Sequence, residues 1–330
     1  MTSKLIFLTN PIHPLVHAEM ETFARVTVSP SIRDEDLIAG AREASIVVVR
    51  TPIPAALYEQ APNLLGVIRH GAGVDMIPIP EATERGIAVA NAPGTNAVTV
   101  AEFAVGQMLS LAHRSAAANQ RMRATGWASA RALADQGLEL AGKKVGLVGV
   151  GAIGQAVAKM CHFGFGMSVC GYRPSGRGSF DFIEMTSLEQ VLSQSDFVVL
   201  ACPLNASTKG LISRALLSNM KPSSYLINVA RGAVVDQQAL VEALTEKRLA
   251  GAALDVFTEQ PLPTASPLYG MENVLLSPHM AGVTDDSLKA MGSSVARQAR
   301  QILSGQLPDH LVNHEAASQL QEHLARRLRK

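Results

Sequence analysis

A glycine-rich turn near the middle of the chain constrains the fold more than any other feature. The apolar run Val145–Val148 leads directly into Gly149-Val150-Gly151-Ala152-Ile153-Gly154, and a helical pattern follows. A short buried strand that runs into G-x-G-x-x-G predicts a strand–turn–helix unit that binds the pyrophosphate of a dinucleotide at the helix N-terminus. The residues expected to contact this cofactor are Gly149, Gly151, Ala152, Ile153 and Gly154.

The rest of the chain alternates short apolar runs with helical patterns, which is typical of doubly wound parallel sheets. The predicted strands are 5–8, 26–28, 46–49, 65–68 and 87–90 before the breaker cluster Asn91–Asn96, and 145–148, 168–171, 197–201, 225–229, 252–256 and 274–276 after it. With 330 residues the chain is long enough for two domains. We therefore predict an α/β protein with two doubly wound parallel-sheet domains. Residues 1–96 and 297–330 form a substrate domain, and residues 97–296 form an inserted dinucleotide-binding domain.

Two long helices are expected near the domain boundaries. Thr99-Val-Ala-Glu102 predicts a capping box that opens a helix to about His113. This helix is apolar on nearly all sides, so we expect it to be buried between domains or between subunits. A second helical pattern runs from Thr284 to about Leu303.

Composition excludes several classes of partner. The formal net charge is +1, which favours neither nucleic acid nor an anionic membrane. No apolar stretch approaches the roughly 20 residues of a membrane span. The three cysteines have neither metal-ligand spacing nor the number of a disulfide framework, so we expect no metal and reduced thiols. The N-terminus reads as a first strand rather than a targeting segment, and we expect a cytoplasmic protein.

Polar residues follow several predicted strands, where a parallel sheet binds its ligands. Arg231, Asp255 and His279 lie at or just beyond strand ends in the second domain, so they are candidates to converge on a nicotinamide ring. Hydride transfer to a ketone needs a proton donor, which histidine supplies near neutral pH. Arginine suits a bidentate hold on a carboxylate. In the first domain, the N–H groups of Ala72 and Gly73 are candidates to complete the carboxylate site.

Taken together and in order, the motifs resemble the D-isomer-specific 2-hydroxyacid dehydrogenase family, which includes glyoxylate/hydroxypyruvate reductases and phosphoglycerate dehydrogenase-like enzymes. The resemblance covers nearly the whole chain. The matching stretches are Gly71-Ala-Gly-Val-Asp75, Asn91-Ala-Pro-Gly, Val100-Ala-Glu102, Gly149–Gly154, Cys202-Pro-Leu204, Asn228-Val-Ala-Arg-Gly232, Ala253-Leu-Asp-Val-Phe257 and Ser277-Pro-His279.

The resemblance implies a flavodoxin-like substrate domain, a Rossmann cofactor domain, a cleft between them and a homodimer. It implies that Arg231 binds a small 2-oxoacid, that His279 is the acid/base and that Asp255 contacts the nicotinamide carboxamide. Further cofactor contacts are expected from Thr99, Cys202, Pro203, Val229, Ala230 and Gly282.

The chain departs from the family at Gln260, where most members carry a glutamate that pairs with the histidine. A glutamine accepts the ring N–H through its amide oxygen but offers no charge to stabilise the cation. We therefore expect a lower pKa for His279 than in relatives with glutamate. The adjacent Glu259 is not expected to substitute, because neighbouring side chains usually point in different directions.

A second departure concerns the cofactor. An acid that binds the ribose 2′-OH is expected about 20 residues past the glycines. Arg173 stands 19 residues past Gly154, in the segment Tyr172-Arg-Pro-Ser-Gly-Arg177. Arg173 and Arg177 would attract a 2′-phosphate, and Ser175 would donate a hydrogen bond to it. The sequence therefore predicts NADP(H) as the preferred cofactor, with NAD(H) possible.

Alternatives remain open from sequence. Gln260 is shared with formate dehydrogenases, so oxidation of formate or phosphite competes with 2-oxoacid reduction. Some proteins that resemble the family are non-enzymatic, dinucleotide-sensing corepressors. Arg50 and Arg69 lie near strand ends of the first domain, where they either hold a second anionic group of the substrate or form ion pairs. His70, beside the Ala72–Gly73 turn, is expected to be structural.

Overall fold

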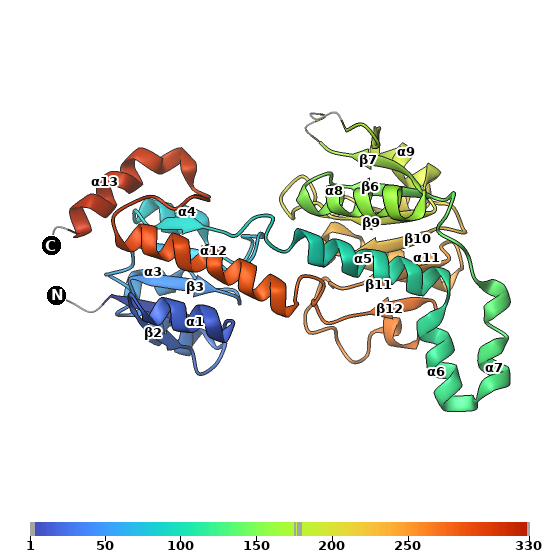
Figure 1. The fold of residues 1–330 in the computed structure, drawn as a ribbon, viewed down its shortest axis with the longest axis horizontal. Helices are drawn as coiled ribbons and strands as arrows, with labels where there is room; N and C mark the ends of the chain where they lie inside the picture. The colour runs from blue at the N-terminus through green and yellow to red at the C-terminus, as the bar shows by residue number, and fades with distance from the viewer. Residues whose placement is uncertain (1–3, 175, 177–179, 329–330) are drawn as a thin grey trace. The chain divides into compact units, whose positions relative to one another are not determined.

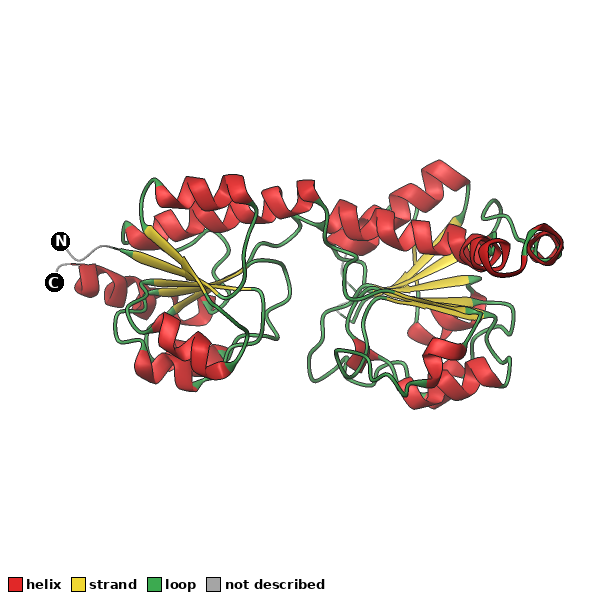
Figure 2. Cartoon of the chain, turned by 90° about the horizontal axis from the view of Figure 1, so that it is seen from below, coloured by secondary structure: helices red, strands yellow, loops and turns green. Residues whose placement is uncertain are grey.

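The computed structural model describes residues 4–174, 176 and 180–328, which form two compact units. Unit 1 comprises Met1–Asn96 and Val283–Lys330, and unit 2 comprises Ala97–Gly282. In each unit a parallel sheet forms the central layer and helices cover both of its faces (Figure 2). The predicted fold class, two doubly wound α/β domains, is confirmed.

The sheet of unit 1 has the strand order β2-β1-β3-β4-β5 among the described residues. Its strands are β1 (Leu5–Leu8), β2 (Arg25–Val28), β3 (Ile46–Val49), β4 (Gly66–Arg69) and β5 (Ala88–Ala90). This is the flavodoxin-like order, in which the chain reverses direction across the sheet between β1 and β3. Every residue of β1 and β3 is buried, because a parallel strand is covered by helices on both faces.

The helices of unit 1 come from both ends of the chain (Figure 1). They are α1 (Pro14–Glu21), α2 (Asp34–Ala41), α3 (Ala56–Gln60), α4 (Ile79–Glu84), α12 (Asp285–Leu303) and α13 (Ala317–Leu328). Helix α12 packs against α1 and β4 and buries Val295, Ala299 and Ile302 in the core of unit 1. The unit boundary therefore lies at Val283 rather than at the predicted residue 297, because α12, which starts at Asp285, packs against α1 and β4 of unit 1.

The sheet of unit 2 has the order β12-β11-β10-β9-β6-β7-β8 among the described residues, with all pairs parallel. Its strands are β6 (Lys144–Val148), β7 (Ser168–Tyr172), β8 (Glu184–Met185), β9 (Phe197–Leu200), β10 (Tyr225–Asn228), β11 (Gly251–Leu254) and β12 (Val274–Leu276). Read from β6 outward, this is the dinucleotide-binding order 3-2-1-4-5-6 with one further strand. The direction of winding reverses between β6 and β9, which is where such sheets bind ligands.

The helices of unit 2 correct one expectation. They are α5 (Ala97–Ala112), α6 (Ser115–Thr125), α7 (Trp127–Arg131), α8 (Ala152–Lys159), α9 (Leu188–Gln194), α10 (Arg214–Leu217) and α11 (Gln237–Thr245). Helix α5 begins at Ala97, so Thr99 lies inside the helix and the predicted capping box at Thr99–Glu102 is wrong. The chain also continues past α5 into α6 and α7, which extend away from the sheet of unit 2 (Figure 1).

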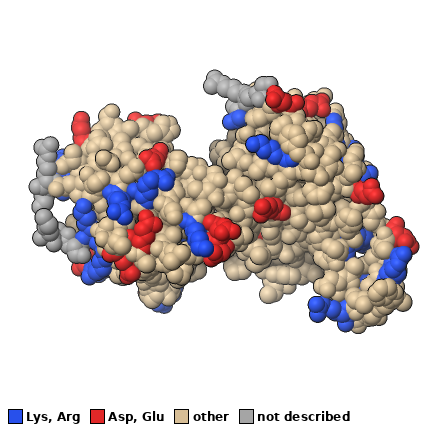
Figure 3. Space-filling view, in the orientation of Figure 1, with Lys and Arg blue, Asp and Glu red and all other residues tan. Residues whose placement is uncertain are grey.

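No described helix combines the length and apolarity that crossing a bilayer requires. Basic and acidic side chains are interspersed on the face drawn in Figure 3.

Candidate active site

The glycine turn connects β6 to α8 and leaves no room for side chains at two positions. Gly149 has φ of 103°, and a Cβ there would lie 2.7 Å from the backbone nitrogen of Cys202. A Cβ on Gly154 would lie 2.2 Å from the carbonyl oxygen of Gly149, so only glycine lets α8 start this close to the turn. A Cβ on Gly151 would meet nothing within 4 Å. The turn therefore fits a pyrophosphate, because its backbone and the first N–H groups of α8 remain approachable at Gly151.

The other expected cofactor residues follow neighbouring strands of the same sheet. Because the sheet is parallel, the carboxyl ends of all its strands lie on the same side of the sheet. The segments that follow the strands therefore lie next to one another on that side. The segments are Gly149–Gly154 after β6, Cys202 and Pro203 after β9, Val229 and Ala230 after β10, Asp255 after β11 and His279 after β12. Thr99 lies in the first turn of α5 and Gly282 is the last residue of unit 2.

Arg173 follows β7 and lies beside the glycine turn. The backbone N–H of Gly149 donates to the carbonyl of Tyr172 at 2.9 Å, which links the two loops directly. The side chain of Arg173 is exposed. Ser175 and Arg177 lie outside the described residues.

Asp255 is buried, and its carboxylate holds the loop that carries the candidate acid/base. Oδ1 accepts from the Ser277 hydroxyl at 2.7 Å and from the Met280 N–H at 2.9 Å, and Oδ2 accepts from the Ala281 N–H at 2.9 Å. The carbonyl of Asp255 also accepts from the N–H of His279 at 2.8 Å. Sequence reasoning expected a cofactor contact here and missed this anchoring of residues 277–281.

The His279 ring pairs with the side chain of Gln260. Nδ1 of His279 lies 3.1 Å from Oε1 of Gln260. Because a glutamine Oε1 can only accept a hydrogen bond, Nδ1 is the ring nitrogen that carries the hydrogen in this pair. His279 has φ of 54°, a left-handed conformation that is uncommon outside glycine. Glu259 does not take this position and instead lines a neighbouring groove.

The loop that carries Arg231 is oriented by Asn228 at the end of β10. The buried Asn228 side chain donates to the carbonyl of Arg231 at 3.1 Å and accepts from the N–H of Ala230 at 3.0 Å. Nη1 of Arg231 donates to the carbonyl of Ala230 at 2.8 Å. Asn228 is a supporting residue whose role sequence reasoning did not predict, although its place in the Asn228–Gly232 motif was recognised.

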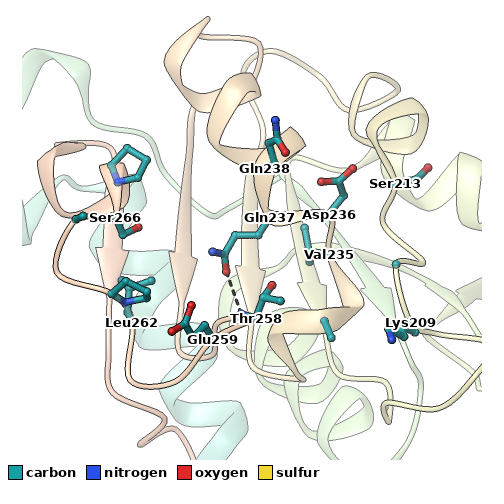
Figure 4. A pocket seen from close by; sticks show the side chains of 15 residues that line it. Lys209, Ser213, Val235, Asp236, Gln237, Gln238, Thr258, Glu259, Leu262 and Ser266 are labelled. Carbon is teal, nitrogen blue, oxygen red and sulfur yellow. Dashed lines mark hydrogen bonds between the residues drawn. The ribbon is translucent and has the colours of Figure 1, made fainter.

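A groove of about 810 Å³ in unit 2 adjoins the loop that carries Gln260. Figure 4 shows Gln237 of α11 next to Thr258 among its lining residues, and Oε1 of Gln237 accepts from the N–H of Thr258 at 3.0 Å. Neither Arg231, His279 nor the glycine turn lines this groove. The side chain of Gln237 therefore holds the backbone of Thr258, at the start of the loop that carries Gln260, and does so from outside the candidate site.

In unit 1, Ala72 and Gly73 lie in the turn that follows β4. His70 lies in the same segment, and its pKa is lowered to about 4. The main cause is burial of the ring, and the positive charge of Arg50 contributes less. Nε2 of this buried ring has no partner among the described residues. At neutral pH His70 is therefore an uncharged core side chain, as expected from sequence.

A comparison with known proteins identifies the class of enzyme. The model of the NAD-binding domain of D-isomer-specific 2-hydroxyacid dehydrogenases matches residues 105–281. The chain belongs to this family. The family match covers the glycine turn, the Arg231 loop and the His279 loop, so the geometry above is that of a D-2-hydroxyacid dehydrogenase.

Individual relatives agree with this assignment. A glyoxylate reductase of Korarchaeum cryptofilum is 38% identical over 277 residues, which cover 83% of each chain. A D-3-phosphoglycerate dehydrogenase of Methanocaldococcus jannaschii is 35% identical over 314 residues, but the match covers 93% of this chain and only 59% of that relative. Among solved structures, the chain is similar to the NADPH-dependent glyoxylate/hydroxypyruvate reductase of Sinorhizobium meliloti in complex with NADP and malonate. The TM-score is 0.83 at 29% sequence identity, and the match covers 94% of this chain and 97% of the reductase. The chain is therefore an NAD(P)-dependent oxidoreductase of the D-2-hydroxyacid dehydrogenase type.

Proposed function

We propose that the enzyme interconverts a small 2-oxoacid and the corresponding D-2-hydroxyacid, with NADP(H) as the preferred cofactor. The observation that carries this proposal is the Gln260–His279 pair, which orients the imidazole of the candidate acid/base in the loop after β12, a strand of the sheet that also carries the glycine turn. The three buried free thiols fit a reducing compartment, so we propose that the enzyme acts in the cytoplasm.

Each candidate residue has a distinct role in this proposal. The residues of the glycine turn and Arg173 hold the dinucleotide, which supplies or accepts the hydride when bound. Arg231 binds the carboxylate and polarises the carbonyl of the 2-oxoacid. His279 donates the proton from Nε2 to the substrate oxygen during reduction and takes it back during oxidation. In unit 1, the N–H groups of Ala72 and Gly73 bind the substrate carboxylate.

The activity is tested by following NADPH oxidation with a panel of 2-oxoacids that includes glyoxylate, hydroxypyruvate and longer analogues. We expect turnover with at least one small member. Reduction of NADP⁺ or NAD⁺ by formate or phosphite, without 2-oxoacid turnover, would instead support the formate-type alternative. Tight NADPH binding without any turnover would support the non-enzymatic alternative.

Cofactor preference depends on Arg173 in this proposal. We expect kcat/KM to be higher with NADPH than with NADH, and Arg173→Asp to shift the ratio toward NADH at least about tenfold, because a carboxylate repels the 2′-phosphate. Arg33→Asp, a similar charge change at the exposed start of α2 in unit 1, serves as the control and should leave the ratio unchanged. A clear NADH preference of the unmodified enzyme would contradict the proposal.

Gln260 sets the charge state of the proton donor. In Gln260→Glu a carboxylate faces Nδ1 and stabilises the imidazolium, which raises the pKa of His279. Because reduction needs the protonated ring, the upper limb of the pH–rate profile for reduction should move to higher pH by about one unit. Glu259→Gln removes the neighbouring charge and should leave this limb in place. An unmoved limb in Gln260→Glu would show that the pair does not tune the donor.

We further propose that the enzyme is a homodimer joined through α6 and α7. Neither helix buries any residue among those described, and Trp127 at the start of α7 is 71% exposed. Such helices gain stability by packing on another chain, and aromatic residues are enriched in interfaces. Light scattering should give twice the mass of one chain, and Trp127→Glu should shift the enzyme toward monomer. Leu15→Glu, at an equally exposed site in unit 1, is the control. A monomeric unmodified enzyme would exclude the dimer.

A further inference from the structure

Arg69, the last residue of β4, folds its side chain under the turn that follows it. Nε donates to the carbonyl of Gly73 at 3.1 Å, and Nη1 donates to the carbonyls of Val49 at 2.8 Å and His70 at 3.2 Å. One guanidinium therefore ties both ends of the turn to the end of β3. A planar group with five N–H donors can make such a set of bonds, whereas a lysine ammonium cannot reproduce its geometry.

Asn91 and Ala92, which follow β5, bond the two carbonyls in the middle of the same turn. Nδ2 of Asn91 donates to the carbonyl of Ala72 at 2.7 Å, and the backbone N–H of Ala92 donates to the carbonyl of Gly71 at 2.9 Å. The carbonyl of Asn91 in turn accepts from the buried side chain of Gln298 on α12 at 2.8 Å. The four carbonyls of residues 70–73 are thus all bonded within unit 1.

This arrangement determines where the N–H groups of the turn point. In a planar trans peptide unit, the carbonyl of one residue and the N–H of the next point in opposite directions. Donors that hold the carbonyls of Gly71 and Ala72 therefore direct the N–H groups of Ala72 and Gly73 away from Asn91 and Ala92. Within the described part of the chain, these two N–H groups donate to no acceptor. Neighbouring N–H groups with a common direction bind anions, and the nearby guanidinium charge favours a negative ligand.

We propose that Arg69 and Asn91 are positioning residues, which aim the N–H groups of Ala72 and Gly73 at the substrate carboxylate. Neither side chain needs to touch the substrate. The inference rests on the proposed function, because that proposal assigns the carboxylate to this turn. It gives Arg69 a role on backbone carbonyls that neither sequence-based alternative, a second anion site or an ion pair, contained.

The test uses Arg69→Lys, Asn91→Ala and Asn91→Asp in the full-length enzyme. Asn91→Asp keeps the side-chain shape but cannot donate to Ala72, so it remains informative if Asn91→Ala fails to fold. The measurements are kcat, KM for the best 2-oxoacid, the dissociation constant of oxamate from the NADPH-loaded enzyme and the dissociation constant of NADPH. Oxamate probes the carboxylate site without turnover.

We expect KM and the oxamate dissociation constant to rise about tenfold in each variant, because misaligned donors lose a hydrogen bond to a charged group. We expect kcat to change less than about threefold and NADPH binding to be unaffected. The controls are Arg85→Lys, which alters an arginine bonded to the carbonyl of Glu81, and Asn273→Ala, which removes an amide bonded to the carbonyl of Ala250. Both should leave oxamate binding unchanged.

The outcomes separate this inference from the proposed function. If the unmodified enzyme reduces 2-oxoacids but the three variants bind oxamate as it does, the positioning role is wrong and the proposed function stands. An equal weakening of oxamate and NADPH binding would show a merely structural role and also overturn the inference. If the unmodified enzyme neither turns over a 2-oxoacid nor binds oxamate, both proposals fail.

Discussion

Replacing His279 with asparagine should lower kcat by roughly 10²- to 10⁴-fold, the usual contribution of a positioned acid/base. Asparagine is the informative substitute, because it tolerates the left-handed φ of 54° at this position better than most residues do. The backbone bond from residue 279 to the carbonyl of Asp255 is then retained while the imidazole is lost. Steady-state kinetics measures the loss, and dinucleotide fluorescence measures whether the cofactor still binds.

A matched control separates the chemistry from general effects of losing a histidine. His113→Asn changes an exposed histidine at the end of α5 in the same unit and should leave kcat unchanged. The dissociation constant of NADPH should stay within about threefold in both variants, since the glycine turn is untouched. If His279→Asn keeps kcat within tenfold of the unmodified enzyme, another group donates the proton.

Gly232→Ala should destabilise the enzyme and remove most of its activity. A Cβ at this position would lie 1.9 Å from the carbonyl carbon and 2.1 Å from the carbonyl oxygen of Phe257, and 2.3 Å from the nitrogen of Thr258. These neighbours are backbone atoms, so the clash cannot be relieved by rotating a side chain. One of the two loops must move, and they carry Arg231 and Gln260 respectively. The expected cost is about 3 kcal/mol or more, equivalent to a fall in Tm of roughly 6–12 °C.

Calorimetry and kcat/KM together test this prediction. Gly270→Ala is the control, because a Cβ there would meet nothing within 4 Å and φ is not positive. It should change Tm by no more than about 2 °C. A Gly232→Ala enzyme with unchanged Tm would mean that the contact between the two loops is loose. If Tm is unchanged but kcat/KM falls, the substitution displaces Arg231 and Gln260 without destabilising the fold.

Most strands were predictable because they are buried on both faces and therefore read as continuous apolar runs. The strands β1, β3 and β12 have the predicted bounds. Strand β8 was missed, since it is a two-residue edge strand, Glu184–Met185, with no apolar run. The start of α5 was misplaced because Thr99–Glu102 satisfies a local capping pattern that the helix, beginning at Ala97, does not use.

The sequence by itself determined the fold class and the family, because hydrophobic periodicity, glycine spacing and the order of motifs can all be read along the chain. Only the tertiary structure showed which groups support them. Asp255 holds residues 277–281 through three hydrogen bonds, and Gln260 meets His279 at 3.1 Å although 19 positions separate them. Arg69 and Asn91 meet at one turn from the ends of β4 and β5. These contacts depend on strand order and loop geometry, which bring together residues whose spacing along the chain carries no signal.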